Sequence, residues 1–451
     1  MGNKVSIGDV VSLSQGFAVN SKSKHLMGDS GLPLLRITDL INGTEAQYLT
    51  KETAPTKCIA HKHEIIFTRT GQVGLVFRGR EGVVHNNCFK VIPNEDLVTH
   101  DYIYWTLKQP HIIKLANNVA SGSVQKDLNH SAFKSIDIDL IPKTVQEQNC
   151  QILNRIDEKI NLNRQINQTL EQMAQTLFKS WFVDFDPVID NALDAIASGK
   201  KVEIPEVFET RVERRKAVRE SADFKPLPDD VRQLFPSEFE ESELGWVPKG
   251  WRGGNISDLA LINPSSWTKK NAPDQVEYVD LASAKFGTIQ SSEIYAYDEA
   301  PSRARRILFK HDTIFGMVRP ANRSFAYVDR NGLTGSTGFV VVRAKESAAR
   351  SFVHIAITSN DAISEFVRIA DGAAYPAIKP DDIADYPTVL PCPEVLKLFE
   401  GIVSNYREKI ATNISSSKGL AELRDTLLPK LISGELRLDS LQVEQAKALV
   451  E

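Results

Sequence analysis

The sequence predicts an α+β protein in which one compact α/β domain occurs twice and each copy is followed by a long helix. Two observations carry this prediction. Segments that lie half the chain apart repeat one another in the same order, and the hydrophobic period changes from that of strands to that of a helix after each copy. Because a chain of 451 residues exceeds one ordinary core, several domains are expected.

The repeat appears when the sequence is aligned with itself at offsets of 248 to 250 positions. The matched pairs of segments are HKHEIIF (61–67) with FKHDTIF (309–315), SGSVQK (121–126) with DGAAYP (371–376), and HSAFKSIDIDLIP (130–142) with KPDDIADYPTVLP (379–391). Offsets that agree within two residues over about 80 positions are hard to obtain by chance, so we infer an internal duplication.

Each copy is expected to contain the same elements in the same order. Short β-branched strands come first, separated by Gly, Asn and Pro turns: LPLLRITDL and EIIFTR in copy one, VEYVDLA and TIFGMV in copy two. A short helix follows over residues 101–118 or 351–370, then a Gly-bearing loop, then a strand that ends at Pro142 or Pro391. Such a unit is a compact α+β domain of about 140 residues.

After each closing proline the sequence takes a heptad pattern. The candidate seam residues are Ile152, Ile156, Asn163, Ile166, Leu170, Met173 and Leu177 in the first helix, and Ile402, Tyr406, Asn413, Leu420, Leu423 and Leu427 in the second. The polar breaks correspond as well, because Asn163 and Asn413 are 250 positions apart. Apolar residues at positions a and d are typical of helices that pack in a coiled coil.

Two ways of packing these helices stay open. Either helix alone would favour packing on its own domain, whereas two equally long helices behind duplicated domains favour packing on each other or on a partner. Since the order is domain, helix, domain, helix, a pseudo-twofold arrangement makes the two helices antiparallel and separates the two domains. About 32 residues at ~1.5 Å rise make a spacer of about 48 Å.

The expected domain boundaries follow from these patterns. They are residues 1–143 for the first domain, 144–185 for the first spacer helix, 186–244 for a connector, 245–391 for the second domain, and 392–451 for the second spacer helix with a C-terminal tail. The connector has no counterpart in the second half of the chain. Its charged stretch FETRVERRKAVRE (208–220) is expected to be a helix with a solvated face.

Composition and charge exclude several classes of protein. A net charge of −4 and a pI near 6.2 are not typical of a histone-like nucleic-acid binder, so any DNA contact must come from local clusters. No stretch reaches the ~18 apolar residues of a spanning helix, which predicts a cytoplasmic protein without membrane contact. The cysteines at 58, 88, 150 and 392 lack metal-ligand spacing and are expected to be reduced, packed thiols.

The motifs of several enzyme classes are missing. There is no G-x-x-x-x-G-K-(S/T) phosphate loop, no G-x-S-x-G nucleophile elbow and no H-E-x-x-H. The (N/D)-P-P-(Y/F) tetrapeptide of amino-methyltransferases is absent, and the nearest approach, NPSSW (263–267), lacks the second proline. A D-x-K fragment at 157–159 lies on the first long helix. A self-contained methyltransferase or nuclease is therefore disfavoured, and no catalytic or metal-binding residue is expected.

Side chains able to contact DNA gather in both copies. Arg, Asn and Gln make bidentate contacts to base edges, and Lys and Arg also hold phosphates. The candidates are Arg69, Gln72, Arg78, Arg80, Gln125 and Lys126 in the first domain, and Arg303, Arg305, Arg306, Arg319, Asn322, Arg323 and Tyr375 in the second. A single surface arginine is usually only solvated, so the clusters carry this prediction.

The order of parts resembles the specificity subunit of type I restriction-modification systems over essentially the whole chain. The phrases that carry the resemblance are DLIPKTVQEQNCQILNRIDEKI (139–160), SWFVDFDPV (180–188), LFPSEFEESELGWVPKGW (234–251) and LRDTLLPKLISGELRL (423–438). Pro142 with Gln146-Glu147-Gln148 resembles the family's junction before the first helix. The second junction departs from it, because Glu394 has no following Gln.

The resemblance implies that two target-recognition domains each read one half of a split DNA sequence while an antiparallel coiled coil sets the gap. It implies double-stranded DNA, two methyltransferase (M) subunits and restriction-translocation (R) subunits as partners in the prokaryotic cytoplasm, in phage defence. S-adenosylmethionine, ATP and Mg are then used by those partners in DNA methylation and cleavage, and no cofactor is bound by this chain.

One alternative is a duplicated protein-interaction scaffold, whose helices organise partners and whose domains bind protein without reading a DNA sequence. Salt-dependent binding to duplex DNA separates the two interpretations, because phosphate contacts release counterions and protein contacts of mixed character do not.

Overall fold

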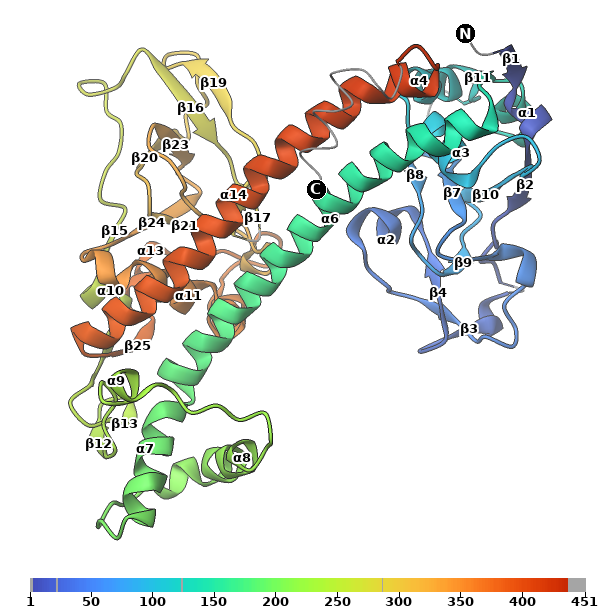
Figure 1. The fold of residues 1–451 in the computed structure, drawn as a ribbon. Helices are drawn as coiled ribbons and strands as arrows, with labels where there is room; N and C mark the ends of the chain where they lie inside the picture. The colour runs from blue at the N-terminus through green and yellow to red at the C-terminus, as the bar shows by residue number, and fades with distance from the viewer. Residues whose placement is uncertain (1–2, 22, 123–124, 286, 437–451) are drawn as a thin grey trace. The chain divides into compact units, whose positions relative to one another are not determined.

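The computed structural model describes residues 3–21, 23–122, 125–285 and 287–436. The chain divides into two compact units: unit 1 holds the described parts of 1–164 and 414–451, and unit 2 holds those of 165–413. Each unit combines a mixed α/β domain with stretches of two long helices, α6 (Lys143–Phe178) and α14 (Pro393–Ile432) (Figure 1). We call residues 3–142 domain 1 and residues 245–391 domain 2.

Domain 1 contains three sheets. A two-stranded sheet pairs β1 (Asn3–Ser6) with β11 (Asp137–Leu140). A four-stranded sheet has the strand order β2 (Val11–Gln15), β10 (Cys88–Pro93), β7 (Ile65–Thr68) and β8 (Val76–Phe77). A five-stranded sheet has the strand order β3 (Met27–Gly28), β5 (Tyr48–Leu49), β4 (Leu32–Leu35), β9 (Gly82–Val84) and β6 (Ile59–Ala60). The helices are α1 (Ile7–Val10), α2 (Ile37–Asn42), α3 (His100–Leu107), α4 (Pro110–Val119) and α5 (His130–Lys134), with short 3₁₀ turns at Lys24–Leu26 and Thr56–Cys58.

Domain 2 contains the matching sheets and one extra hairpin. A two-stranded sheet pairs β14 (Arg252–Asn255) with β25 (Pro387–Leu390); one four-stranded sheet has the order β15 (Ala260–Ile262), β24 (Phe339–Ala344), β21 (Thr313–Gly316), β22 (Phe325–Tyr327); the other has the order β19 (Glu293–Ala296), β16 (Gln275–Val279), β23 (Leu333–Ser336), β20 (Ala304–Leu308); β17 (Ala284–Lys285) pairs with β18 (Thr288–Ile289). The helices are α10 (Ile256–Leu259), α11 (Arg350–Thr358), α12 (Asn360–Ile369) and α13 (Pro380–Ala384), with 3₁₀ turns at Pro320–Asn322 and Ser347–Ala349.

The two domains share one topology, which confirms the predicted duplication. In each, the parallel pair of the mixed sheet is β4 with β9 or β16 with β23, and an antiparallel strand flanks it on either side. The central strands β7 and β21 are buried at all four positions. A short continuous apolar run of this kind is expected of a strand that is covered on both faces. The sequence-predicted fold class is therefore correct.

The single helix predicted before each loop is two helices, α3 with α4 and α11 with α12. In domain 1 the break lies at Gln109, whose backbone is extended before Pro110 begins α4. Proline disfavours a helical conformation in the residue before it. In domain 2, Ser359 ends α11 in an extended conformation and its side chain accepts a hydrogen bond from the amide of Ala362, capping α12. The apolar periodicity continued across both breaks and concealed them.

The two long helices run antiparallel within each unit. In unit 1, Asn149 on α6 donates to the carbonyl of Leu431 at 2.7 Å, and Asn163 donates to Ser417 at 3.1 Å. The residue numbers of the partners on α14 therefore fall as those on α6 rise. In unit 2, Asn413 on α14 donates to Asn167 at 2.8 Å. The bonds at Asn163 and Asn413 occupy equivalent places in the repeat, because their partners are also 250 positions apart.

Burial along the helices shows which seam residues pack. Within their own units, Ile152, Ile156, Asn163, Asn413, Leu420 and Leu427 are buried, and Ile166, Leu170, Leu177, Ile402, Tyr406 and Leu423 are partly buried. Met173 is 45% exposed and does not pack between the two helices, whereas its neighbour Ala174 is buried. A straight helix turns about 20° per heptad away from a strict seven-residue repeat, which moves the buried face onto the adjacent position.

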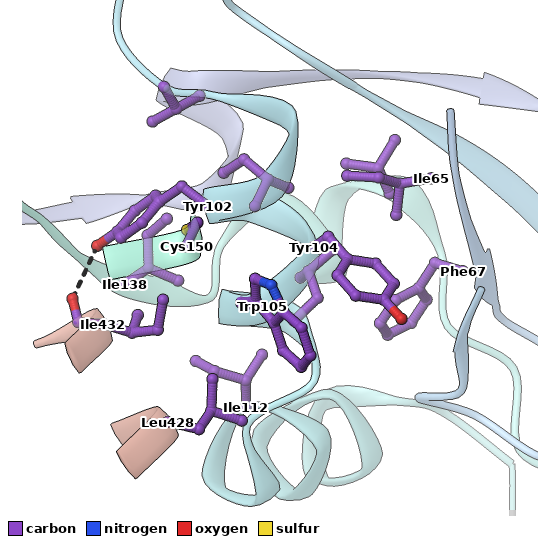
Figure 2. Close-up of a cluster of buried hydrophobic side chains, with 14 of the residues drawn as sticks. Ile65, Phe67, Tyr102, Tyr104, Trp105, Ile112, Ile138, Cys150, Leu428 and Ile432 are labelled. Atoms are coloured by element: carbon purple, nitrogen blue, oxygen red, sulfur yellow. Dashed lines mark hydrogen bonds between the residues drawn. The ribbon is translucent and has the colours of Figure 1, made fainter. Parts of the chain in front are cut away.

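The helices also pack on their own domains, so both packing modes considered from the sequence occur. In unit 1, the Tyr102 hydroxyl of α3 donates to the carbonyl of Ile432 at 3.1 Å, and Leu428 and Ile432 of α14 lie against the buried aromatic cluster of domain 1 (Figure 2). The thiol of Cys150 on α6 lies in the same cluster, where burial raises its pKa. The four cysteines are free thiols, as predicted.

The junction that precedes α6 is held by Gln146. Its buried side chain accepts a hydrogen bond from the amide of Thr99 at 3.0 Å and donates to the carbonyl of Ile141 at 2.8 Å. Leu396 stands 250 positions later on α14 and lacks these groups. The second junction therefore differs in chemistry, as the missing Gln suggested.

The connector folds as part of unit 2. After a π-helical turn at Lys179–Val183 it contains α7 (Asp186–Ala197), a 3₁₀ turn at Glu206–Phe208, α8 (Glu209–Arg219), α9 (Asp229–Arg232), β12 (Phe239–Ser242) and β13 (Gly245–Pro248). Phe185, Phe208 and Phe235 join the buried core of domain 2. The basic face of α8 is not simply solvated, since Arg215 is ion-paired with Asp190 of α7. That expectation was wrong because the acidic partners come from a different helix.

Candidate nucleic-acid interface

In domain 1, a short loop (121–127) closes against the end of β7 through backbone hydrogen bonds. Ser121 and Asp127 exchange two of them, at 2.9 and 2.8 Å. The amide of Gly71 donates to the carbonyl of Lys126 at 2.9 Å, and the amide of Leu128 donates to the carbonyl of Arg69 at 2.9 Å. These bonds fix the backbone at the two described ends of the loop whatever side chains they carry.

Domain 2 builds the same loop (371–377) with the same bonds. Asp371 and Ala377 exchange two hydrogen bonds at 3.0 and 2.9 Å, and the amide of Arg319 donates to the carbonyl of Pro376 at 2.7 Å. The second residue of each loop is a glycine with positive φ, +97° at Gly122 and +110° at Gly372. Glycine adopts this conformation without the steric penalty of a Cβ atom. One backbone frame is thus used twice with different side chains.

The three arginines predicted in domain 1 are engaged within the protein. Arg69 donates to both carboxylate oxygens of Asp127 at 2.8 and 2.6 Å and to the carbonyl of Leu128 at 3.2 Å. Arg78 is ion-paired with Asp101, and Arg80 reaches Glu45 at 3.4 Å. These guanidinium groups brace the domain, and the side chains that remain open to a ligand are Gln72 and Gln125 together with Lys126.

Lys126 is the cationic residue of this loop that remains available to a ligand. Its ammonium group contacts only the carbonyl and side-chain oxygens of Asn117, at 3.1 and 3.3 Å, among the described residues. The carboxamide of Gln125 lies 3.9 Å from the position that a Cβ would occupy at Gly71, and Gln72 follows Gly71 directly. The structure therefore brings the predicted Gln72, Gln125 and Lys126 to the same side of domain 1.

The arginine run of domain 2 is more open. Arg303 is exposed, and Arg305 lies over the Tyr297 ring at 4.8 Å from its centroid. Arg306 is partly buried, donates to Ser266 at 3.4 Å, and its buried Nε atom has no hydrogen-bond partner among the described residues. Burial lowers the pKa of Arg306. The pairing of β20 with β23 shifts register between Ala304 and Arg306, so Arg305 and Arg306 do not follow the regular alternation of a strand.

The loop of domain 2 presents an arginine on an aromatic ring. The guanidinium carbon of Arg319 lies 4.7 Å from the centroid of Tyr375, which is 69% exposed, and Arg319 also donates to the carbonyl of Ala374 at 3.0 Å. Asn322 is exposed on the following 3₁₀ turn. Arg323 is held differently, donating to Asn360 at 2.6 Å. Arg319, Tyr375 and Asn322 thus form one exposed polar and aromatic surface.

Two further basic residues were missed from the sequence. Lys269 and Lys270 are exposed on the turn after Trp267, and the amide of Trp267 donates to the carbonyl of Arg305 at 2.7 Å. They therefore stand beside the arginine run. The Lys-Lys pair was the available signal, but the 33 positions between Lys270 and Arg303 hid the proximity.

The described residues contain no group of three or more His, Cys, Asp or Glu side chains arranged to hold a metal ion. Among the same residues no helix is long and apolar enough to cross a bilayer. The polar surface that the structure offers is therefore one of amides, cations and an aromatic ring, which suits hydrogen bonding to base edges and phosphates.

A family model described as the type I restriction modification DNA specificity domain matches residues 3–172. The chain is 26% identical over 393 residues to the HindI type I restriction enzyme specificity subunit of Haemophilus influenzae, covering 78% of this chain and 81% of that protein. It is 22% identical over 459 residues to the MjaIX specificity subunit of Methanocaldococcus jannaschii, covering 96% and 93%. The chain is therefore similar to type I restriction specificity subunits over most of its length, and residues 3–172 match the specificity domain itself.

A solved structure shares the fold of this chain. A crystal structure of the type I restriction-modification S subunit from M. genitalium matches with a TM-score of 0.53 at 12% identity, covering 96% of each chain. At that identity the likeness concerns the fold. It spans both domains and both long helices of this chain, although the family model matches only the first part of the chain.

Proposed function

We propose that this chain is a specificity subunit that reads a bipartite DNA site, with domain 1 and domain 2 each recognising one half. The observation that carries the proposal is the loop frame that occurs once per domain. Its backbone is fixed by the same hydrogen bonds, whereas its side chains are Gln125 and Lys126 in one copy and Tyr375 and Pro376 in the other. Two loops with the same backbone bonds and different side chains are suited to recognising two different DNA sequences.

The exposed side chains support contact with DNA. In domain 2, Arg303, Arg305 and Arg319 have no carboxylate partner among the described residues, so their guanidinium groups are free to pair with guanine edges or phosphates. In domain 1, Gln72 and Gln125 offer the amide geometry that suits adenine. The net charge of −4 is compatible with this function if partner subunits share the phosphate contacts.

We further propose that the helix pair sets the spacing between half-sites and docks methyltransferase subunits. Apolar side chains remain exposed on it: Leu162 and Ile414 in unit 1 are 48% and 46% exposed, and Met173 in unit 2 is 45% exposed. A spacer of about 48 Å exceeds one turn of DNA, ~34 to 36 Å, which is compatible with half-sites on one face of the duplex.

Catalysis belongs in this proposal to partner subunits in the cytoplasm. Methyltransferase subunits use S-adenosylmethionine to methylate adenine, and restriction-translocation subunits use ATP and Mg to move and cut DNA. Enzymes that modify a base flip it out of the duplex, so the specificity subunit holds the DNA where a flipped adenine reaches a neighbouring pocket.

The test is methylome sequencing of a host that expresses this chain with its neighbouring methyltransferase subunit, beside a host that expresses the methyltransferase alone. A split adenine-methylated motif that requires this chain is the expected result. If the assembled complex is soluble and adds no motif, the protein-interaction scaffold becomes the better interpretation, and absence of salt-dependent binding to duplex DNA would confirm that change.

A further inference from the structure

In unit 1, domain 1 is joined to α6 by a polar cluster around Asn154, which we call the Asn154 cluster. The Asn154 side-chain oxygen accepts from the indole of Trp105 and from Arg78, both at 2.8 Å. Its side-chain nitrogen donates to Asp101 at 2.8 Å. The cluster therefore uses both acceptor sites and one of the two donors of this amide.

Arg78 restricts the side chains of the Asn154 cluster to one orientation. Its guanidinium lies 3.9 Å from the ring centroid of Tyr104 and is ion-paired with Asp101. A guanidinium is planar, so stacking on one ring and bonding to two different side chains leaves one orientation in which every contact is made. The turn after β8, helix α3 and helix α6 are held together at this point.

In unit 2, domain 2 is joined to α14 by a different cluster, which we call the Arg407 cluster. The Arg407 guanidinium of α14 lies 3.9 Å from the ring centroid of Tyr327 on β22 and donates to the Ser351 hydroxyl at 2.8 Å. The amide of Ser351 in turn donates to Glu400 of α14 at 2.7 Å. The first turn of α11 is thus bound to α14 through both a hydroxyl and an amide.

Two histidines in turn contact the Tyr327 side chain of the Arg407 cluster. The Tyr327 hydroxyl lies 3.1 Å from His311 Nδ1, and its ring meets the ring of His354 edge to face at 5.2 Å. Burial lowers the pKa of both Arg407 and His354. A cation in such surroundings is a poor source of stability compared with apolar packing, and it is better explained by the single geometry that it imposes.

The two clusters lie at equivalent places but are built in opposite ways. Asp101 and Ser351 are 250 positions apart in the repeat, and so are Asp157 and Arg407. In unit 1, Asp157 is used between the helices, in an ion pair with Arg424 at 3.0 Å. The arginine that stacks on tyrosine therefore comes from the domain in unit 1 and from the helix in unit 2.

We propose that the Asn154 cluster and the Arg407 cluster are positioning locks that hold each domain at one angle on its helix and thereby restrict the DNA spacer length that the subunit accepts. The inference rests on the proposed function. Apolar contacts are non-directional and tolerate small rotations, whereas stacked and hydrogen-bonded guanidinium groups do not. A base pair added to the spacer moves a half-site along and around the duplex, so a fixed domain angle rejects it.

The test compares binding of the assembled complex with its methyltransferase subunit to duplexes that carry both half-sites at the native spacer or at a spacer one base pair longer or shorter. Asn154→Leu and Arg407→Met are expected to reduce the preference for the native spacer about tenfold, the size of a typical coupling between contacting residues. A mismatch inside either half-site is expected to cost as much as in the wild type.

Arg330→Met is the matched control, because Arg330 is ion-paired with Glu277 inside domain 2 at 2.6 Å and joins neither long helix among the described residues. It is expected to keep the wild-type spacer preference. Tyr327→Leu supplies a second route should Arg407→Met fail to assemble, since it removes the stacking ring and keeps the bond to Ser351. Lock variants that weaken all duplexes equally, or leave the preference unchanged, would overturn the proposal. A wild type that ignores half-site mismatches would instead refute the proposed function.

Discussion

Domain 1 and domain 2 share a topology and a loop frame, yet their arginines do different things. Arg69, Arg78 and Arg80 of domain 1 are ion-paired with acidic residues. In domain 2, by contrast, the exposed Arg303 and the partly buried Arg305 have no acidic partner among the described residues. The difference teaches that a cluster of arginines in sequence indicates an electrostatic frame or a ligand surface, and that only the position of the carboxylates separates the two.

The largest expected loss of stability comes from breaking the ion pair that lies beside the central strand of each domain. Asp312 is 1% exposed and accepts two hydrogen bonds from Arg343, both at 2.7 Å; in domain 1, Lys90 pairs with Glu64 at 2.9 Å. Arg343→Met should destabilise the protein by about 3–5 kcal/mol, because it leaves a buried carboxylate unpaired. Denaturant unfolding measures this.

The control replaces both partners. Asp312→Leu with Arg343→Met should recover most of the lost free energy of unfolding, since the buried charge is gone. Lys90→Met should reproduce the loss in domain 1 and spare recognition by domain 2. Equal loss of both half-sites from either single variant would contradict the independence of the domains.

The next effect distinguishes the helix seam in the two units. Leu420 is 4% exposed in unit 1, and Leu170 is only partly buried in unit 2. Leu420→Asp should lower stability by about 3 kcal/mol and prevent assembly with the methyltransferase subunit, because it buries a charge and removes packed methyl groups. Leu170→Asp should cost clearly less. Thermal unfolding and size-exclusion chromatography of the co-expressed complex test the order.

A third pair of variants distinguishes an arginine that stabilises its domain from an arginine that contacts DNA. Arg69→Met removes the bonds to Asp127 and Leu128 and should cost about 2 kcal/mol of stability, with loss of the domain 1 half-site. Arg319→Met should change stability by less than ~0.5 kcal/mol and still weaken binding to DNA. Urea unfolding and binding titrations of both variants suffice, and the comparison fails if Arg319→Met is the more destabilising change.

The smallest effect on stability belongs to the exposed run of domain 2. The double change Arg303→Ser and Arg305→Ser should leave the unfolding free energy within about 0.5 kcal/mol and reduce the salt dependence of DNA binding by up to about two phosphate contacts. Arg306 is left in place because its Nε atom is buried without a hydrogen-bond partner among the described residues. Lys200→Ser with Lys201→Ser, an exposed pair on the connector, is the matched control and should alter neither quantity.

Part of the candidate site could be predicted from the sequence. The loops were located because Gly122 and Gly372 recur at the same place in the repeat, and Gln125, Lys126, Arg319 and Tyr375 were found with them. Lys269 was not, because a turn far away in sequence reaches Arg305 only through the pairing of backbone segments. Arg78 was named for DNA contact, although its partners Asp101 and Asn154 are 23 and 76 positions away.

The sequence by itself determined the duplication, the α+β class and the two long helices, because these depend on local periodicity and on the recurrence of short segments. The tertiary structure decided which cations are free, which helix position packs, and how each domain is fixed to its helix. Asp157 and Arg407 illustrate the reason: they are equivalent in the repeat, and their different roles depend on partners that folding brings from elsewhere in the chain.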